Sequence, residues 1–194
     1  VSLGWRVVVA VAPDQYIDEL RVFDIEIEPV SFESGGLFPL QDLRAFFSLL
    51  QIYRKYHPCL IHHFNNKPIL LGNLAVSILG ESKVVNTITG LGYTFGQKGL
   101  SYYLMKIGFH LLTKSDATIF QNTDDQKLFS SKRWIVDEKS FLVIGSGVDT
   151  SQFAPNVPPV FHSEPRVLMV SRKKKKKGVR EYIEAAKSVK DRFP

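Results

Sequence analysis

The chain has 194 residues, of which 44% are hydrophobic, and a formal net charge of +6. This apolar share is ordinary for a globular protein and allows a packed core, while a single cysteine, Cys59, excludes an internal disulfide. Lys173–Lys177 carry five of the positive charges, so the excess is mostly local and gives little support for nucleic-acid binding by the whole chain. No uninterrupted apolar run reaches the roughly 20 residues of a membrane-spanning helix.

Apolar runs alternate with segments of helical periodicity along the first 147 residues. The expected strands are rich in β-branched residues and cover residues 6–12, 25–32, 59–64, 83–89, 117–121 and 141–144. The expected helices lie between or beside them and cover residues 13–20, 40–56, 67–79, 100–113 and 123–130. This alternation predicts an α/β fold with a doubly wound parallel sheet, that is, a Rossmann-like domain.

A second unit is expected at the end of the chain. An apolar run at residues 167–170 predicts a strand, a basic loop follows at 171–177, and helical spacing of apolar residues resumes after Gly178. We therefore expect residues 1–147 to form the first domain, residues 148–165 a linker rich in proline and polar residues, and residues 166–194 the beginning of a second Rossmann-like domain.

The basic loop is a candidate diphosphate site. A strand, loop and helix in this order place Arg172, Lys177 and Gly178 beside a helix N-terminus, where N–H groups and the helix dipole favour anions. Arginine can bind a phosphate through two N–H donors, and lysine adds a point charge. The alternatives are a solvated charge run, which we favour for Lys173–Lys176, and a nuclear-localisation or nucleic-acid patch. No aromatic residues interleave with the lysines to stack on bases, which disfavours the last interpretation.

His62 and His63 end an expected strand just before a turn at residues 65–68. Because side chains alternate along a strand, one imidazole should face the covering helices and the other the opposite side. A pair of hydrogen-bonded histidines is the commoner case for such a pattern. No cysteine or acidic residue lies at ligand spacing nearby, so no metal site is expected.

The segment after the strand at 83–89 is rich in glycine. Gly90, Gly92 and Gly96 either let backbone approach a ligand closely or simply permit positive φ in a turn. Tyr93 would be an exposed aromatic residue in this loop. The expected helix at 100–113 is apolar nearly all round and is flanked by lysines, which fits either a buried core helix or an edge that rests on an anionic membrane or a lipid-linked substrate.

Four segments together carry a resemblance to a known family. They are HHFNNKPILLG, VVNTITGLGYTFG, IGSGVDTSQFAP and VLMVSRKKKKKGVREYIEAAK, in this order. They resemble the family 4 glycosyltransferases of the GT-B fold, especially the bacterial branch that extends sugars on undecaprenyl-diphosphate carriers in capsule, O-antigen and N-glycan assembly. The resemblance implies two Rossmann-like domains with the active site between them, the acceptor on the N-terminal domain and the nucleotide sugar on the C-terminal domain.

The resemblance also implies roles for individual residues. Arg172 and Lys177 match the pair that stabilises the donor diphosphate as it leaves, beside Gly178, and His63 falls on or next to a catalytic histidine of the family. The implied acceptor-binding residues face the same cleft and are His62, Lys67, Thr89, Gly90, Gly92 and Tyr93.

The resemblance further implies the partners and location of the protein. It implies a nucleotide-sugar donor, UDP-linked, a lipid-linked glycan acceptor and retention of configuration. It implies no metal, no other cofactor and no nucleic acid. The expected location is cytoplasmic and peripheral, at the inner face of the plasma membrane.

The sequence departs from the family pattern in three ways. The run of five consecutive lysines is unusual, because mixed residues normally lie between the arginine and the Lys-Gly pair. The paired glutamates of the family are expected beyond Pro194, and its first strand is expected before Val1. We therefore expect a fragment that folds around its N-terminal sheet and does not complete catalysis alone. Two other interpretations stay open. One is a GT-B sugar-nucleotide epimerase with carboxylate acid–base chemistry. The other is a non-catalytic module whose lysine run docks nucleic acid or membrane.

Overall fold

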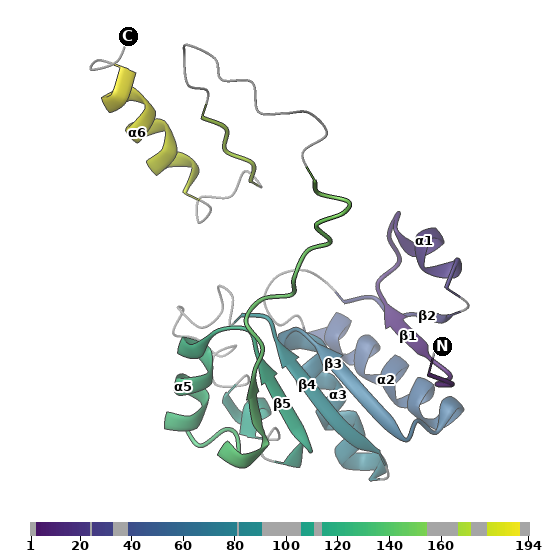
Figure 1. Ribbon diagram of the computed structural model, residues 1–194. Coiled ribbons are helices and arrows are strands. Elements are labelled where there is room, and N and C mark those ends of the chain that lie inside the picture. The colour runs from purple at the N-terminus through teal and green to yellow at the C-terminus, as the bar shows by residue number, and fades with distance from the viewer. Residues whose placement is uncertain are drawn as a thin grey trace. The chain divides into compact units, whose positions relative to one another are not determined.

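The computed structural model describes residues 3–23, 25–32, 39–80, 82–90, 106–110, 114–154, 167–171 and 178–190. It forms two compact units, Val1–Gly147 and Val148–Pro194 (Figure 1). The first unit contains all the strand pairing found in the described ranges, and the second contains the helix α6. Every described helix is too short or too polar to cross a bilayer.

The first unit is built from parallel strands joined by helices. A two-stranded sheet pairs β1 (Val8–Val11) with β2 (Glu26–Pro29), and the short helix α1 (Ile17–Arg21) connects them. A four-stranded sheet has the order β3 (Leu60–Phe64), β4 (Lys83–Ile88), β5 (Ala117–Phe120) and β6 (Ser140–Leu142), with every neighbouring pair parallel.

Helices make the crossovers between these strands. The connection from β2 to β3 is α2 (Pro39–Tyr56), that from β3 to β4 is α3 (Asn66–Leu79), and α5 (Thr123–Ser131) with the short 3-10 helix η3 (Asp137–Lys139) leads to β6. Residues 106–110 are also helical. The α/β Rossmann-like class predicted from the sequence is confirmed.

The helices α2, α3 and α5 pack on one face of the four-stranded sheet. His63, Asn86 and Phe120 share this face by register, and they contact α2, α3 and α5 respectively. On the opposite face, large apolar side chains remain exposed in the described residues, among them Phe64 and Phe141, each 51% exposed.

Two apolar clusters form the core. One joins β4 and β5 to α5 and the helical residues 106–110, with the rings of Phe109 and Phe129 4.9 Å apart and those of Phe120 and Phe129 5.3 Å apart. The other joins both sheets to α2 and α3 and is built from Val30, Ala45, Leu49, Leu50, Tyr53, Ile61 and Ala75. The second cluster therefore ties the two-stranded sheet to the rest of the unit.

The predicted strand at 167–170 is wrong. Val167, Leu168 and Val170 are 77–87% exposed and adopt no regular structure. The physical reason is that an apolar run becomes a strand only when a neighbour accepts its backbone hydrogen bonds, and none pairs with it in the described residues. The helix expected after Gly178 is confirmed as α6 (Val179–Lys190), and the hydroxyl of Tyr182 donates to the carbonyl of Val167 at 2.7 Å.

Close packing of α3 on β3 depends on Gly72. A Cβ atom at this position would lie 2.1 Å from Nε2 of His63, closer than real atoms approach. The neighbouring strand and helix are both part of the buried core, so neither side can move away freely.

We expect Gly72→Ala to lower the free energy of unfolding by about 1–3 kcal/mol, because the added methyl group overpacks the α3–β3 contact. Urea denaturation measures this change. Ser77→Ala, at an exposed position of the same helix, should stay within about 0.5 kcal/mol of the wild type. Equal stability of the two variants would contradict the close approach.

Candidate functional site at the carboxyl edge of the sheet

The loops that follow β3 and β4 are hydrogen-bonded to one another. The N–H of Asn65 donates to the carbonyl of Thr87 at 3.2 Å, the hydroxyl of Thr89 donates to Oδ1 of Asn65, and Nδ2 of Asn66 donates to the carbonyl of Gly90 at 3.3 Å. Asn65 has a φ of 70°, a conformation that asparagine tolerates better than most residues. Open α/β sheets bind ligands at the carboxyl ends of their strands, so this edge is the candidate site.

His63 lies beneath this edge in the core and is 4% exposed. Its Nδ1 is 3.0 Å from Oδ1 of Asn86, which also accepts a hydrogen bond from Nδ2 of Asn73 at 2.9 Å. An amide oxygen only accepts, so Nδ1 of His63 carries the proton. Nε2 is then the acceptor for the hydroxyl of Tyr53, at 2.8 Å. Both ring nitrogens are therefore bonded within the protein.

Burial sets the protonation state of this network. It lowers the pKa of His63 to about 4, with a further lowering from His62 that is opposed by the hydrogen bond to Asn86. Burial also raises the pKa of Tyr53. At neutral pH the histidine is thus neutral and the tyrosine is protonated, which matches the donor and acceptor assignment above.

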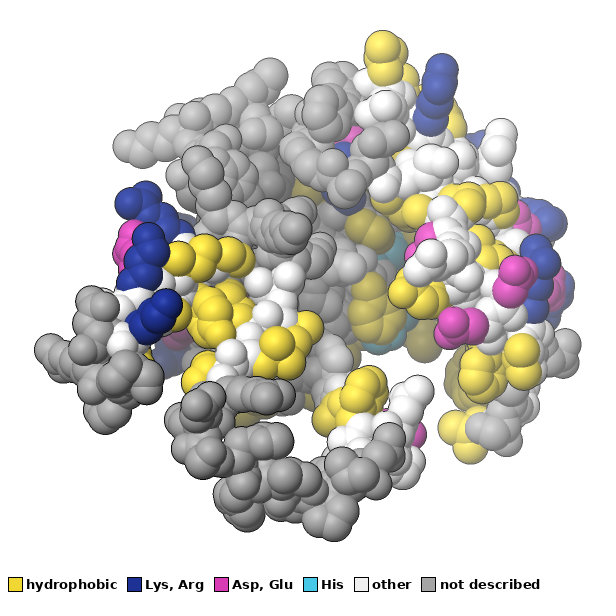
Figure 2. Space-filling view, turned by 90° about the horizontal axis from the view of Figure 1, so that it is seen from above, with side chains coloured by type: hydrophobic (Ala, Val, Ile, Leu, Met, Phe, Trp, Pro, Cys, Tyr) yellow, Lys and Arg dark blue, Asp and Glu magenta, His cyan; other side chains and the backbone are white. Residues whose placement is uncertain are grey.

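His62 points to the opposite face of β3 and is exposed. Its Nε2 lies 2.8 Å from Oγ1 of Thr87, and its ring stacks on Phe64 with centroids 4.2 Å apart. Partial burial lowers its pKa. Figure 2 shows, from above, small areas of histidine set deep beside hydrophobic side chains. Of the two adjacent histidines, His62 is the one that a ligand can reach.

Lys67, in the first turn of α3, forms an ion pair with Asp42 in the first turn of α2. Its Nζ is 2.8 Å from Oδ1 of Asp42, and the two side chains are only 13% and 10% exposed. Such an enclosed pair is costly to break by removing one partner. The lysine therefore joins α2 to α3, and its charge is compensated within the protein.

The remaining predicted site residues are placed only in part. Gly92, Tyr93, Arg172 and Lys177 lie outside the described residues. Gly178 directly precedes α6 and has a φ of 71°, which favours glycine. The structure thus places Thr89 and Gly90 at the edge and His62 on the exposed face of β3 that leads to it, with His63 and Lys67 packed beneath or beside the edge.

The sequence analysis missed four partners that hold these residues: Asp42, Tyr53, Asn73 and Asn86. Two of them gave a recognisable signal. Asn73 interrupts an apolar helix and Asn86 an apolar strand, and buried polar side chains in such runs normally have a hydrogen-bonding partner. Asp42 and Tyr53 fit the pattern of an ordinary amphipathic helix and gave no such signal.

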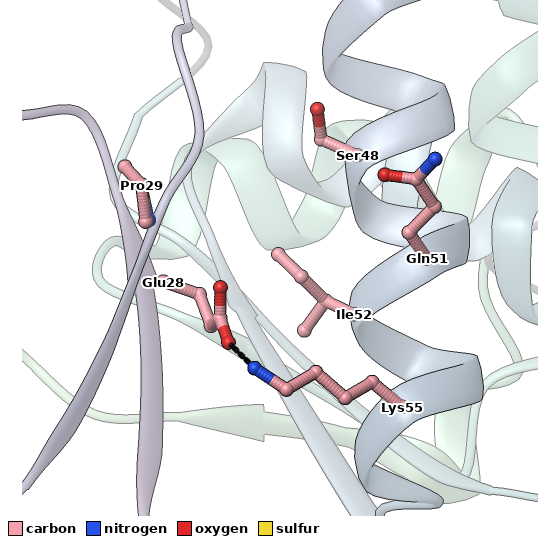
Figure 3. Close-up of a pocket in the computed structure, with 6 residues that line it drawn as sticks. All are labelled: Glu28, Pro29, Ser48, Gln51, Ile52 and Lys55. Carbon is pink, nitrogen blue, oxygen red and sulfur yellow. Dashed lines mark hydrogen bonds and ion pairs between the residues drawn. The ribbon is translucent and has the colours of Figure 1, made fainter.

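Two cavities lie elsewhere than at the carboxyl edge, the second of them lined in part by Tyr53. One, of about 190 Å³, lies between β2 and α2 and contains the ion pair of Lys55 and Glu28, with Nζ and Oε1 2.5 Å apart (Figure 3). The other, of about 470 Å³, includes His57, Cys59 and Leu79 at the amino end of β3. Within the described ranges, no three His, Cys, Asp or Glu side chains are grouped to hold a metal ion.

The family of the chain follows from residues 2–122, which match the family described as "Glycosyl transferase 4-like". The chain belongs to this family. The matched range includes both sheets as far as β5 and both histidines of β3.

Two curated relatives of this glycosyl transferase 4-like chain are bacterial enzymes. One is the UDP-Gal:alpha-D-GlcNAc-diphosphoundecaprenol alpha-1,3-galactosyltransferase of Escherichia coli, 24% identical over 118 residues, which are 61% of this chain and 30% of the relative. The other is the N,N'-diacetylbacillosaminyl-diphospho-undecaprenol alpha-1,3-N-acetylgalactosaminyltransferase of Campylobacter jejuni, 24% identical over 203 aligned positions, 96% of this chain and 54% of the relative. The chain thus spans about a third and about half of their lengths.

Solved structures share the fold. A glycosyltransferase from Rickettsia africae superimposes with a TM-score of 0.65 at 21% identity, covering 98% of this chain and 51% of that chain. UDP-N-acetylglucosamine 2-epimerase from Rickettsia bellii gives 0.50 at 15% identity, covering 70% and 36%. At these identities the likeness establishes the architecture of the glycosyl transferase 4-like chain and not its reaction.

The buried histidine makes stability depend on pH. The pKa of His63 is about 4 in the folded protein against 6.5 for a free histidine, so the unfolded chain binds a proton more readily. The stabilisation is complete above pH 6.5 and is lost as pH falls towards 4.

We expect the stability difference between wild type and His63→Gln to shrink by up to about 3 kcal/mol over this window, measured by urea denaturation at each pH. His62→Gln, at an exposed position, should keep most of the wild-type slope, because His62 is the smallest of the three influences on the pKa of His63. A difference that does not change with pH would contradict the assignment.

Proposed function

We propose that this protein provides the acceptor side of a glycosyltransferase and residues that hold the donor diphosphate. The reaction moves a sugar from a nucleotide sugar, UDP-linked, to a lipid-linked saccharide in the synthesis of a cell-surface polysaccharide or glycan, with retention of configuration. The observation that carries the proposal is the family match over residues 2–122, the part of the chain that contains the hydrogen-bonded edge at β3 and β4. Both curated relatives, by name, act on diphosphoundecaprenol-linked sugars.

The carboxyl edge has the chemistry that an acceptor saccharide needs. His62, hydrogen-bonded to the buried Thr87, presents its exposed ring beside that of Phe64, and an apolar ring next to a polar group suits the mixed surface of a sugar. Thr89 and Gly90 add a hydroxyl and a carbonyl from the neighbouring loop. With Gly92 and Tyr93 of the same loop, these are the acceptor-binding residues we propose.

His63 and Lys67 have supporting roles in this proposal. The pattern placed His63 among the catalytic residues, but its two ring nitrogens are bonded to Tyr53 and Asn86 in the core. We assign it to positioning, because its two hydrogen bonds fix β3 in the core and leave the neighbouring His62 on the exposed face. Lys67 acts in the same way through its ion pair with Asp42.

The donor side is proposed for Arg172, Lys177 and Gly178. In the transfer, an acceptor hydroxyl oxygen bonds to the anomeric carbon while the bond from that carbon to the diphosphate oxygen breaks. The bonding electrons leave with the nucleoside diphosphate, and the hydroxyl proton passes to it. Fixed cations lower this barrier because negative charge grows on the leaving group. With two cations in that role, the proposal needs no metal.

We further propose that the protein acts at the inner face of the plasma membrane, where lipid-linked acceptors are reached from the cytoplasm.

Two ligands and three variants test the two sides separately. The probes are UDP and a short-chain prenyl-diphosphate-linked N-acetylglucosamine, with binding to the 194-residue chain measured by calorimetry. We expect His62→Ala to raise the Kd of the saccharide about tenfold, roughly 1.4 kcal/mol, and to leave UDP binding unchanged. Lys177→Ala should weaken UDP binding and leave the saccharide unaffected. Lys55→Ala, an exposed lysine that lines the cavity beside β2, is the control and should change neither.

The outcomes separate the two halves of the proposal. A saccharide that binds wild type and His62→Ala equally would overturn the acceptor site. UDP that fails to bind, or that binds Lys177→Ala as well as wild type, would overturn the donor site. Binding of RNA with a steep salt dependence and no response to either probe would instead favour a nucleic-acid module.

A further inference from the structure

The exposed side of α2 carries large apolar side chains. Leu40, Leu43 and Phe47 are 79%, 49% and 53% exposed, and their spacing of three and four residues places them on one stripe of the helix. The opposite side of α2 is packed, because Ala45 and Leu49 lie in the buried cluster beneath it. The first half of α2 is therefore apolar both towards the core and towards solvent, whereas a surface helix normally turns a polar face outwards.

Positive charge lies along the same stripe. Arg44 is one turn before Phe47 and Arg54 is two turns beyond it, and both arginines are exposed. Neither forms an ion pair with a carboxylate in the part of the chain that the structure describes. The one acidic residue of α2, Asp42, is 7% exposed and is paired with Lys67. The exposed side of α2 is thus apolar and cationic, with no acidic side chain of its own.

The apolar end of this stripe lies near the candidate site. Asp42, directly before Leu43 in the first turn of α2, bonds to Lys67 in the first turn of α3. α3 itself follows the hydrogen-bonded turn at Asn65, while α2 runs back to the amino end of β3. A surface that covers Leu40 and Leu43 therefore lies close to the carboxyl edge of the sheet.

The sequence analysis considered a different helix for contact with a membrane. Of the apolar helix expected at 100–113, the structure describes residues 106–110, where Phe109 is fully buried against the rings of Phe129 and Trp134. This described part fits the interpretation as a core helix. In α2, by contrast, large exposed apolar side chains occur together with exposed arginines.

We propose that the exposed side of α2 docks on an anionic lipid bilayer. Leu40, Leu43 and Phe47 enter the boundary between headgroups and acyl chains, while Arg44 and Arg54 bind lipid phosphates, as in an amphipathic helix that lies in the plane of a membrane. Charge favours a lipid surface over a second copy of the chain, because two copies that meet on this side bring their arginines together.

Docking through α2 also brings the carboxyl edge to the lipid that carries the acceptor, a consequence that rests on the proposed function. A helix with its side chains is about 10 Å across, and Lys67 ties the start of α3 to the first turn of α2. The loops proposed to bind the acceptor are then within reach of a saccharide whose lipid stays in the bilayer.

Vesicle binding tests the docking surface on the 194-residue chain. The probes are vesicles of phosphatidylcholine and phosphatidylglycerol in equal parts and vesicles of phosphatidylcholine alone, and cosedimentation measures the partition coefficient. We expect binding to the anionic vesicles that is lost at high salt, because screening weakens the attraction of the arginines. Phe47→Ser should lower the partition coefficient about tenfold or more, since it removes an inserted ring. Arg44→Gln should lower it about fivefold at low ionic strength, the effect of one cation at the membrane surface.

Two matched variants serve as controls. Phe141→Ser changes a phenylalanine of similar exposure, 51%, in β6, and Arg133→Gln changes an exposed arginine that follows α5. Both positions belong to the β6 end of the sheet, whereas α2 packs at the β3 end. Each control should therefore bind vesicles as wild type does.

A fluorophore shows which side of the protein meets the lipid. In a Cys59→Ser background, which removes the only cysteine, Phe47→Cys and Phe141→Cys each carry one thiol for an environment-sensitive dye. We expect the emission of the dye at position 47 to shift to shorter wavelength when anionic vesicles are added. The dye at position 141 should not respond.

Three results would overturn the docking surface: equal binding of anionic and neutral vesicles, equal effects of Phe47→Ser and Phe141→Ser, or a dye at position 47 that does not respond to lipid. A dimer that forms without vesicles and is lost in Phe47→Ser would assign the stripe to a second copy and would also overturn it. Binding of UDP and of the short-chain saccharide needs no bilayer. Intact binding of both ligands without vesicle binding would therefore overturn the docking surface alone and leave the proposed function standing.

Discussion

A buried hydrogen-bond network around His63 is the constraint on which the rest of the first unit depends. Tyr53 from α2, Asn86 from β4 and Asn73 from α3 all bond to this ring or to its partner. Each group would be expensive to bury alone, so the network is stable only when the two helices and two strands take this one arrangement. Gly72 allows the ring to lie directly against α3. The position of the candidate site follows, because the loops at the carboxyl edge continue from these same elements.

The two adjacent histidines of β3 have different roles in our account because they lie on opposite faces of the strand. Alternation along β3 sends His63 into the core and His62 to the outer face. The first has both nitrogens bonded inside the protein, while the second bonds to Thr87, stacks on Phe64 and stays exposed. Lys67 near this edge is likewise engaged within the protein, because Asp42 compensates its charge and the ion pair joins α2 to α3. In our account, the accessible chemistry of the acceptor side therefore rests on His62 and the loop after β4.

Local patterns predicted most of the elements and left the long-range pairing open. The helix at 40–56 and the strand at 59–64 were predicted nearly to the residue, because their apolar periodicity is strong. Alternation predicted that the histidines would separate, but not which of them would be buried. That depends on Tyr53, ten positions away, and Asn86, 23 away. The apolar run at 167–170 formed no strand, since strand formation needs a neighbour that a local pattern cannot supply. Roles for Arg172, Lys177, Gly92 and Tyr93, outside the described residues, stay predictions.

The most direct test of this account is an NMR titration of the two imidazole rings in ¹⁵N-labelled protein, from pH 7.5 to pH 4. We predict that His63 shows the Nδ1–H tautomer and stays neutral until the pH approaches its pKa of about 4. A His63 ring that takes up its proton near pH 6.5, or that carries its proton on Nε2, would contradict the account. The buried network would then not exist in this form, and the assignment of His63 to structure and His62 to the acceptor site would fall with it.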